Sequence, residues 1–222
     1  MFLYSNQQTC AMECCRKNFI FDLGGVLLDI EPARTFDAFA ALGVGREVLS
    51  EAFALSNSTM LAFESGKISA AELFAYIAGL LPAEKRALPA AELERALCDA
   101  WCALLGNFPP CKWQHLRALR ARGHKVFLLS NTNALHWEVI TRGIENLEGL
   151  ALSDYFDGVF LSYEMGLCKP APRIFEMLVE RAGIAPGDTI FFDDSQANCD
   201  AARSVGIEAV VVERNSAWET II

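Results

Sequence analysis

Short apolar runs bounded by polar residues recur along the chain and predict the strands of a sheet. One run begins at Phe19 and ends at Asp22, and others occupy residues 125–130, 158–162, 189–194 and 208–212. Their apolar positions are nearly continuous rather than alternating, which is typical of strands buried on both faces. We therefore expect a parallel sheet.

Segments with the apolar spacing of helices separate the later runs. They cover residues 113–122, 173–182 and 197–205, and another begins at about Ala134. Regular alternation of strand and helix predicts an α/β fold, in which helices cover both faces of a doubly wound parallel sheet.

The segment between the first two predicted strands has a different pattern. From Pro32 to about Asn107 it is rich in Ala, Leu, Glu and Phe at helical spacing, and Ser69 with Glu72 predicts a capping box. We expect a helical insertion in the α/β unit. The predicted division is an N-terminal tail (residues 1–17), an α/β core (residues 18–31 plus 108–222) and a helical insertion (residues 32–107).

Composition narrows the class of protein. The 222 residues are 53% hydrophobic, enough for a sizeable core, and the formal net charge is −9. Nucleic acids and anionic membranes attract basic surfaces, so we expect neither as a partner. No apolar run reaches the roughly 20 residues of a membrane span. The eight cysteines form no CxxC pair, which favours reduced thiols and a cytoplasmic location.

Polar side chains that could take part in catalysis or ligand binding lie at the ends of the predicted strands or in adjoining loops. The carboxyl ends of parallel strands meet at one edge of a sheet, where ligands bind. Several carboxylates at one edge repel each other unless a cation such as Mg²⁺ is bound, and a carboxylate can also attack phosphorus. The groups expected to converge are Asp22, Ser130-Asn131-Thr132, Lys169-Pro170 and Asp193-Asp194.

At these residues the chain resembles the haloacid dehalogenase-like (HAD) superfamily over roughly residues 18–215. The four motifs of that superfamily occur in order as Asp22-Leu23-Gly24-Gly25-Val26, Ser130-Asn131-Thr132, Lys169-Pro170 and Phe191-Phe192-Asp193-Asp194-Ser195. The resemblance implies a Rossmann-like core, with the helical insertion as an α-helical cap domain.

The resemblance also implies a Mg²⁺ site. Asp22 would be both the nucleophile and a metal ligand, and Gly24 would offer its backbone carbonyl to the metal. Asp194 would be the main acidic ligand of the last motif, and Asp193 a further ligand or a partner of the ligands.

The remaining motif residues would act on the phosphoryl group. Ser130 and Asn131 would bind it, and Lys169 would neutralise its charge and orient Asp22. This implies a phosphatase that works through an aspartyl-phosphate intermediate on a small phosphorylated metabolite, as a monomer or a homodimer.

Gly24 departs from the pattern of phosphatases in this superfamily. Those enzymes usually carry an aspartate at that position, which protonates the leaving group and later activates water. Such a group is worth about 10²–10⁴ in rate. A substrate whose leaving group needs little protonation, such as a sugar 1-phosphate, would be compatible with the missing aspartate. The sequences of the motifs are most similar to those of a subgroup that contains a bacterial α-D-glucose-1-phosphate phosphatase. His136, just after the second motif, is a candidate substitute donor.

Two alternatives remain open at this point. One is a catalytically weak or inactive relative that binds a phospho-ligand. The other is a metal-independent 2-haloacid dehalogenase, which also lacks the second aspartate but has no need for the paired carboxylates at Asp193 and Asp194.

Overall fold

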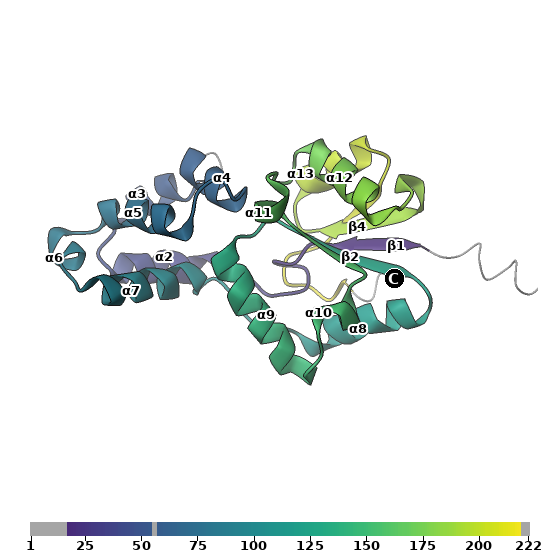
Figure 1. Cartoon of the computed structure of the whole chain (residues 1–222), viewed down its shortest axis with the longest axis horizontal. Helices are drawn as coiled ribbons and strands as arrows, with labels where there is room; N and C mark the ends of the chain where they lie inside the picture. Colours follow the sequence, from purple (N-terminus) through teal and green to yellow (C-terminus); the bar gives the residue numbers. More distant parts are fainter. Residues whose placement is uncertain (1–16, 55–56, 219–222) are drawn as a thin grey trace, which may run out of the picture.

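The computed structural model describes residues 17–54 and 57–218, which form a sheet-centred core beside a helical lobe (Figure 1). Except for Lys17, the predicted N-terminal tail lies outside the described residues. None of the described helices combines the length and the apolarity that a bilayer crossing requires.

A five-stranded sheet in the order β3-β2-β1-β4-β5 forms the centre of the core. Every neighbouring pair is parallel, and Phe21 at the end of β1 lies opposite Leu128 of β2 and Phe192 of β4. The predicted doubly wound parallel sheet is confirmed. The strands are β1 (Asn18–Phe21), β2 (Lys125–Ser130), β3 (Gly158–Leu161), β4 (Thr189–Asp193) and β5 (Glu208–Val211).

Helices cover both faces of this sheet (Figure 1). Helices α8 (Pro110–Ala121), α9 (Ala134–Glu148) and α10 (Leu152–Tyr155) pack on one face, and α12 (Pro172–Ala182) and α13 (Gln196–Ser204) pack on the other. The short α11 (Ser162–Met165) and a 3-10 turn (Pro186–Asp188) complete the core.

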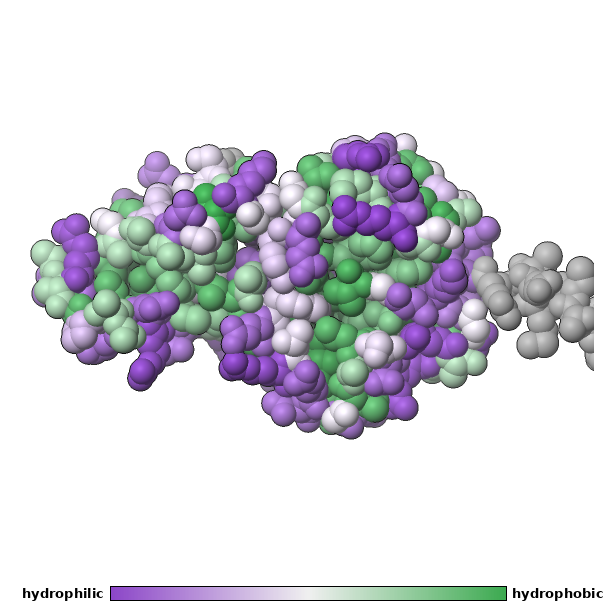
Figure 2. All heavy atoms as spheres, viewed as in Figure 1, coloured by the Kyte–Doolittle hydropathy of each residue, from purple (hydrophilic) through white to green (hydrophobic). Residues whose placement is uncertain are grey.

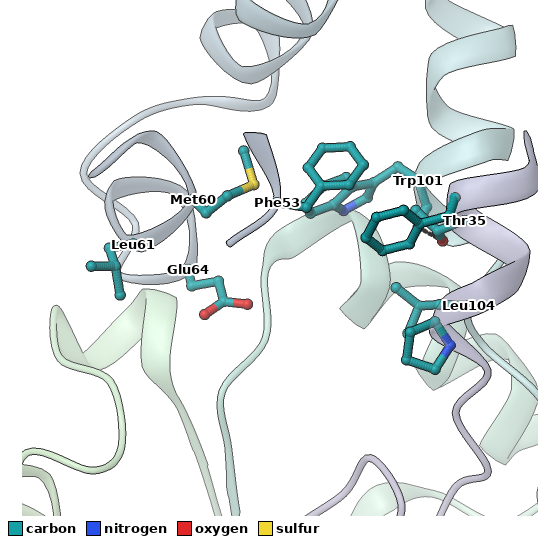
Figure 3. Close-up of a pocket in the computed structure, with 9 residues that line it drawn as sticks. Thr35, Phe53, Met60, Leu61, Glu64, Trp101 and Leu104 are labelled. Atoms are coloured by element: carbon teal, nitrogen blue, oxygen red, sulfur yellow. Dashed lines mark hydrogen bonds between the residues drawn. The ribbon is translucent and has the colours of Figure 1, made fainter. Parts of the chain in front are cut away.

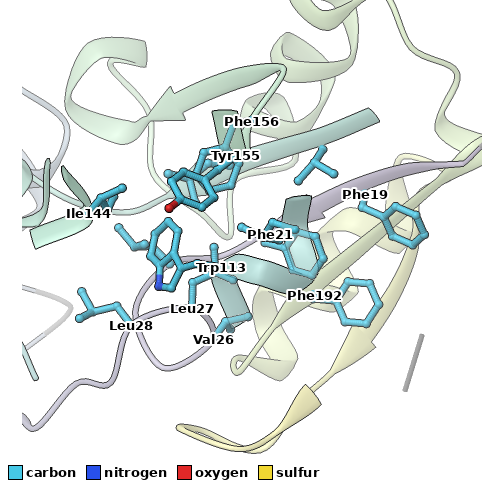
Figure 4. Packing of buried hydrophobic residues seen from close by; sticks show 14 of the residues in the cluster. Phe19, Phe21, Val26, Leu27, Leu28, Trp113, Ile144, Tyr155, Phe156 and Phe192 are labelled. Carbon is cyan, nitrogen blue, oxygen red and sulfur yellow. The ribbon is translucent and has the colours of Figure 1, made fainter. Parts of the chain in front are cut away.

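Strand alternation divides the interior of the core into two apolar clusters. Successive side chains of a strand point to opposite faces, so Phe19 and Phe21 join one cluster while Ile20 joins the other. In the first cluster Phe21, Trp113 and Tyr155 are almost completely buried (Figure 4). The carboxyl end of β1 is thereby fixed from both sides.

The helical lobe, defined here as α2 to α7, has an apolar cluster of its own, which includes Phe39, Leu73, Leu97 and Trp101. The predicted capping box at the start of α5 is present. Figure 2 shows an indentation of the surface where the lobe meets the core. The helices of the lobe are α2 (Pro32–Ala41), α3 (Arg46–Ala52), α4 (Ser58–Glu64), α5 (Ala70–Leu80), α6 (Ala83–Arg86) and α7 (Ala90–Cys102).

Two chain segments connect the lobe to the core, and they pair with each other. The N–H of Asp29 donates to the carbonyl of Asn107 at 2.9 Å, and the N–H of Gly106 donates to the carbonyl of Asp29 at 2.8 Å. Asn215 fixes the first of these segments, because its side-chain amide accepts from the N–H of Ile30 and donates to the Ile30 carbonyl. The position of the lobe is therefore set by backbone pairing.

Some element boundaries differ from the sequence prediction. Helix α8 begins at Pro110 rather than at residue 113, because proline is well tolerated in the first turn of a helix. Strand β3 ends at Leu161, since Ser162 already starts α11, and β4 ends at Asp193, which leaves Asp194 in the following loop.

The buried contacts of α8 give a first prediction. The Leu116 side chain is fully buried at 0% exposure and lies far in sequence from the strand ends. We expect Leu116→Ala to lower the free energy of unfolding by about 2–5 kcal/mol, because it leaves a cavity under the sheet. Val139→Ala, at a position 40% exposed, is the matched control and changes stability little. Urea unfolding measures both, and equal effects would contradict the assigned core.

Candidate active site

The described strands end at a cavity of about 530 Å³ between the core and the helical lobe. Its walls include side chains that follow β1, β2 and β4, as a parallel sheet requires of its carboxyl edge. Leu61 and Glu64 of α4 contribute the wall on the side of the lobe. The predicted site residues that line it are Asp22, Gly24, Ser130, Asn131, Lys169 and Asp194.

Lys169 joins the two buried carboxylates of the site. Its Nζ lies 2.7 Å from Oδ1 of Asp22 and 2.6 Å from Oδ2 of Asp193, and it also donates to the carbonyl of Leu129 at 3.1 Å. The Lys169 side chain is 1% exposed and that of Asp193 is 0% exposed. One cation is thus enclosed by three oxygen acceptors.

Burial and charge act against each other on these groups. The pKa of the Asp22 carboxyl is raised to about 7. Burial is the largest cause of this rise, the charge of Lys169 opposes it, and the charge of Asp193 adds to it. For Lys169, burial lowers the pKa, but Asp22 and Asp193 outweigh burial and leave the pKa above its ordinary value. The ammonium group therefore stays charged, and Asp22 is the carboxylate whose charge depends most on its surroundings.

The Asp193 carboxylate is occupied by the protein. Its Oδ1 accepts from the N–H of Ser195 at 2.8 Å and from the Asn198 side chain at 3.0 Å, while Oδ2 accepts from Lys169. Asp193 does not line the cavity, so its first effect is to hold Lys169.

Asp194 stands at the edge of the cavity, beside Arg214, whose Nε donates to its Oδ2 at 2.5 Å. Gly25 permits this placement. It has φ +82°, and a Cβ there would lie 2.9 Å from Oδ2 of Asp194. A larger residue would be strained in that backbone conformation and would also push against the carboxylate.

The three carboxylates form a candidate cation site. Asp22, Asp193 and Asp194 each offer an oxygen, and these oxygens lie within 4.8 Å of one another. Carboxylate oxygens suit a hard divalent cation such as Mg²⁺, which retains waters and substrate oxygens in its remaining positions. The donor set therefore fits the predicted metal.

Ser130 and Asn131 lie at the end of β2 and differ in their contacts. The Ser130 side chain is buried beside the cavity. The Asn131 side chain donates to the carbonyl of Lys169 at 2.9 Å and accepts from its N–H at 2.8 Å. Asn131 therefore fixes the backbone of Lys169 as well as facing the cavity.

His136 lines the cavity, but both of its ring nitrogens already have partners within the protein. Its Nε2 lies 3.1 Å from the carbonyl of Trp101, its Nδ1 lies 3.1 Å from the Asn133 amide, and its ring stacks on that of Trp101 at 5.3 Å. Both ring nitrogens are engaged, and burial lowers the pKa of His136 to about 4. The imidazole is neutral and links α9 to α7, so the idea of a substitute donor at this position is wrong.

Sequence reasoning overlooked two charged residues of this cavity. Glu64 follows Met60 and Leu61 at helical spacing, and a carboxylate on an apolar helix face was the available signal. Arg214 follows the end of β5, and the same strand-end argument that located the other residues applies to it.

The enclosed lysine gives a second prediction. Lys169→Met removes the cation from between Asp22 and Asp193, and breaking a buried ion pair in this way costs about 3–5 kcal/mol of stability. Chemical denaturation at pH 7 measures the loss. Lys125→Met, at the exposed start of β2, is the control and should leave stability nearly unchanged. Equal stability of the two variants would contradict the ion triad.

The buried histidine gives a third prediction. Because the pKa of His136 falls from 6.5 to about 4 on folding, the unfolded chain takes up the proton first as the pH falls. His136 therefore lowers stability progressively between pH 6.5 and 4, by up to about 1.4 kcal/mol per pH unit. In urea titrations we expect the stability difference between wild type and His136→Gln to shrink across this window. A difference that does not vary with pH would contradict a buried neutral imidazole.

Comparison with known proteins places this arrangement in a family. The sequence model described as haloacid dehalogenase-like hydrolase matches residues 17–206. A D-ribitol-5-phosphate phosphatase of Bacteroides thetaiotaomicron is 31% identical over 202 residues, which cover 91% of this chain and 94% of that protein.

Solved structures agree with that match. A HAD family enzyme of Bacteroides thetaiotaomicron, in complex with magnesium and inorganic phosphate, is 32% identical with a TM-score of 0.83, covering 93% of this chain and 99% of that chain. An L-2-haloacid dehalogenase at 19% identity has a TM-score of 0.58 over 90% of this chain and 85% of its own, which is a likeness of fold alone. With four motifs converging on one cavity and a family match over most of its length, the chain belongs to the haloacid dehalogenase-like hydrolases.

Proposed function

We propose that this protein is a Mg²⁺-dependent phosphatase that hydrolyses a small phosphomonoester of a sugar or polyol. The observation that carries the proposal is the position of Asp22. It lies at the end of the central strand, 2.7 Å from the buried Lys169 and beside two further carboxylates, and it faces a cavity large enough for a small metabolite.

The relatives support both the reaction and the substrate class. The family match and the phosphatases among its relatives confirm the prediction of a phosphoric monoester hydrolase. The relative matched over 91% of this chain is named for a polyol phosphate, and another relative is a phosphorylated carbohydrates phosphatase. A sugar 1-phosphate remains our more specific prediction.

Asp22 and Asp194 would hold Mg²⁺, with the Gly24 carbonyl as a further ligand and Asp193 behind them. When bound, the ion neutralises the carboxylates and the phosphoryl oxygens, and so favours attack by an anion on an anion. Beside a bound cation Asp22 would stay ionised, against the effect of burial on its pKa.

The reaction proceeds in two displacements at phosphorus. An oxygen of Asp22 forms a bond to phosphorus as the bond to the leaving oxygen breaks, which gives an aspartyl-phosphate, and the leaving oxygen takes up a proton from a general acid and departs as an alcohol. Water then attacks the same phosphorus, releases phosphate and restores the carboxylate. Lys169 and Ser130 stabilise the charge on the phosphoryl oxygens in both steps, and Asn131 keeps Lys169 in place.

The helical lobe is, in this proposal, the cap domain (residues 32–107) that covers the site. Its α4 already supplies part of the cavity wall. The proposed location is the cytoplasm, and the five described cysteines are all free thiols, which suits a reducing compartment. We propose a small metabolite as the partner, and a monomer or homodimer.

The fourth prediction concerns the nucleophile. We expect Asp22→Asn to lower phosphate release by roughly 10⁴-fold or more, because the variant cannot form the covalent intermediate. Asp29→Asn, a carboxylate in the linker to the lobe, is the matched control and retains most activity. The assay is a panel of sugar and polyol phosphates with and without Mg²⁺, and wild-type turnover should vanish on chelation.

Other outcomes identify the alternatives. Halide release from 2-chloropropionate without metal would indicate a dehalogenase. Metal-dependent binding of phosphoesters without turnover would indicate a binding protein. Either result, with no phosphate released from any ester, would overturn the proposal.

A further inference from the structure

Position 24 offers no acid and has little room for one. A Cβ at Gly24 would lie 3.3 Å from Cγ2 of Ile30, in the first linker to the lobe. Ile30 is fixed there by two hydrogen bonds to the side chain of Asn215. A proton donor for the leaving oxygen must therefore come from another part of the cavity.

Glu64, the last residue of α4, faces the same cavity from the opposite layer. It lines the cavity together with Asp22, and it also lines an adjoining apolar space of about 120 Å³. Among the described residues, Leu61 and Leu104 are the only others that line both spaces. Figure 3 shows the Glu64 carboxylate directed away from the helix that carries Met60 and Leu61, into the open space between that helix and Leu104.

The carboxylate of Glu64 is available to a ligand. Within the described part of the chain it makes no hydrogen bond and no ion pair, although it is partly buried. Burial raises its pKa, and the charge of Lys169 across the cavity opposes that rise. A carboxyl group with a raised pKa keeps its proton nearer to neutral pH, as a general acid requires.

The end of α4 is positioned by the core rather than by the lobe alone. The Ser162 hydroxyl donates to the carbonyl of Glu64 at 2.6 Å and accepts from the N–H of Thr132 at 2.9 Å. Two residues further on, Gly66 has φ +67°, and a Cβ there would lie 2.1 Å from the carbonyl oxygen of Tyr163. Contacts to α11 and to the loop after β2 thus fix Glu64 relative to the carboxyl edge of the sheet.

We propose that Glu64 is the general acid and base of this enzyme, in place of the aspartate that is absent at position 24; this role rests on the proposed phosphatase function. In the first step its carboxylic acid gives a proton to the leaving oxygen as the bond from that oxygen to phosphorus breaks. In the second step the resulting carboxylate takes a proton from the attacking water, which returns Glu64 to its acid form.

Several titratable groups surround Glu64 and bear on its pH dependence. Lys169 and Asp22 face it across the cavity, and His136 on α9 is held neutral by burial. The Cys168 thiol lies within electrostatic range of Glu64, and burial raises the pKa of that thiol to about 11. Lys67, beyond the end of α4, is the remaining cation near Cys168. Of the two carboxyl groups, Asp22 comes from the core and Glu64 from the helical lobe.

The test compares two kinds of leaving group, and it is the fifth prediction. On the alkyl phosphate that wild type turns over fastest, we expect Glu64→Gln to lower kcat by about 10²–10⁴-fold, the range of a lost general acid. On p-nitrophenyl phosphate, whose leaving group needs no proton, the rate of the first step should stay close to wild type when it is measured as the burst of p-nitrophenolate. The second step, hydrolysis of the aspartyl-phosphate, should slow on both substrates, because it loses its general base. The fall of kcat/KM with rising pH on the alkyl substrate should also disappear. Glu51→Gln, an exposed carboxylate on α3, is the control.

The outcomes separate this proposal from the function on which it rests. Wild-type activity on alkyl phosphates with an equally active Glu64→Gln would overturn the role of Glu64 alone. So would an equal loss in the rate of the first step on both substrates with an unchanged pH profile, because that pattern indicates a structural role. Circular dichroism and Glu64→Asp, which should recover part of the alkyl activity, exclude misfolding. No phosphoester turnover by wild type would overturn the phosphatase and the role of Glu64 together.

Discussion

The ammonium group of Lys169, enclosed by the carboxylates of Asp22 and Asp193, is the interaction on which the site depends. The side chains of Lys169 and Asp193 are 1% and 0% exposed and that of Asp22 is 12% exposed, so each charge is stabilised by the others. The parallel sheet makes this possible, because β1 and β4 are neighbours and deliver the two carboxylates to one edge. Asn131 and Asn198 then hold the lysine backbone and Asp193 by directed hydrogen bonds. The net charge that remains is negative, which is the condition under which a divalent cation stabilises the arrangement.

The second constraint is the fixed position of the helical lobe relative to the core. Paired linkers, the bond from Ser162 to the carbonyl of Glu64, and the stack of Trp101 on His136 hold α4 and α7 over the strand ends. The same contacts bring one carboxylate of the lobe to face Asp22, and this is why a chain without an acid at position 24 can still have one within the site.

The sequence was sufficient to predict the sheet and the residues at its edge, because both follow from local pattern. Buried runs ending in Asp22, Ser130 and Asp193 locate the strand ends, and parallel pairing brings them together. The contacts of Glu64 and His136 were not predictable in this way. They arise where α4 meets α11 and where α7 meets α9, between residues far apart in the chain. The spacing of apolar residues within a helix does not indicate which distant element that helix will contact. Arg214 could have been predicted, because it follows the end of β5 in the same way that Asp22 follows the end of β1.

The central claim is that Asp22 carries the phosphoryl group during turnover. The most direct measurement is mass spectrometry of enzyme quenched in acid while it hydrolyses a phosphoester in the presence of Mg²⁺. We expect a peptide that contains Asp22 and is heavier by one phosphoryl group, and we expect no such peptide from Asp22→Asn. Steady release of phosphate with no phosphoryl group on that peptide would contradict it.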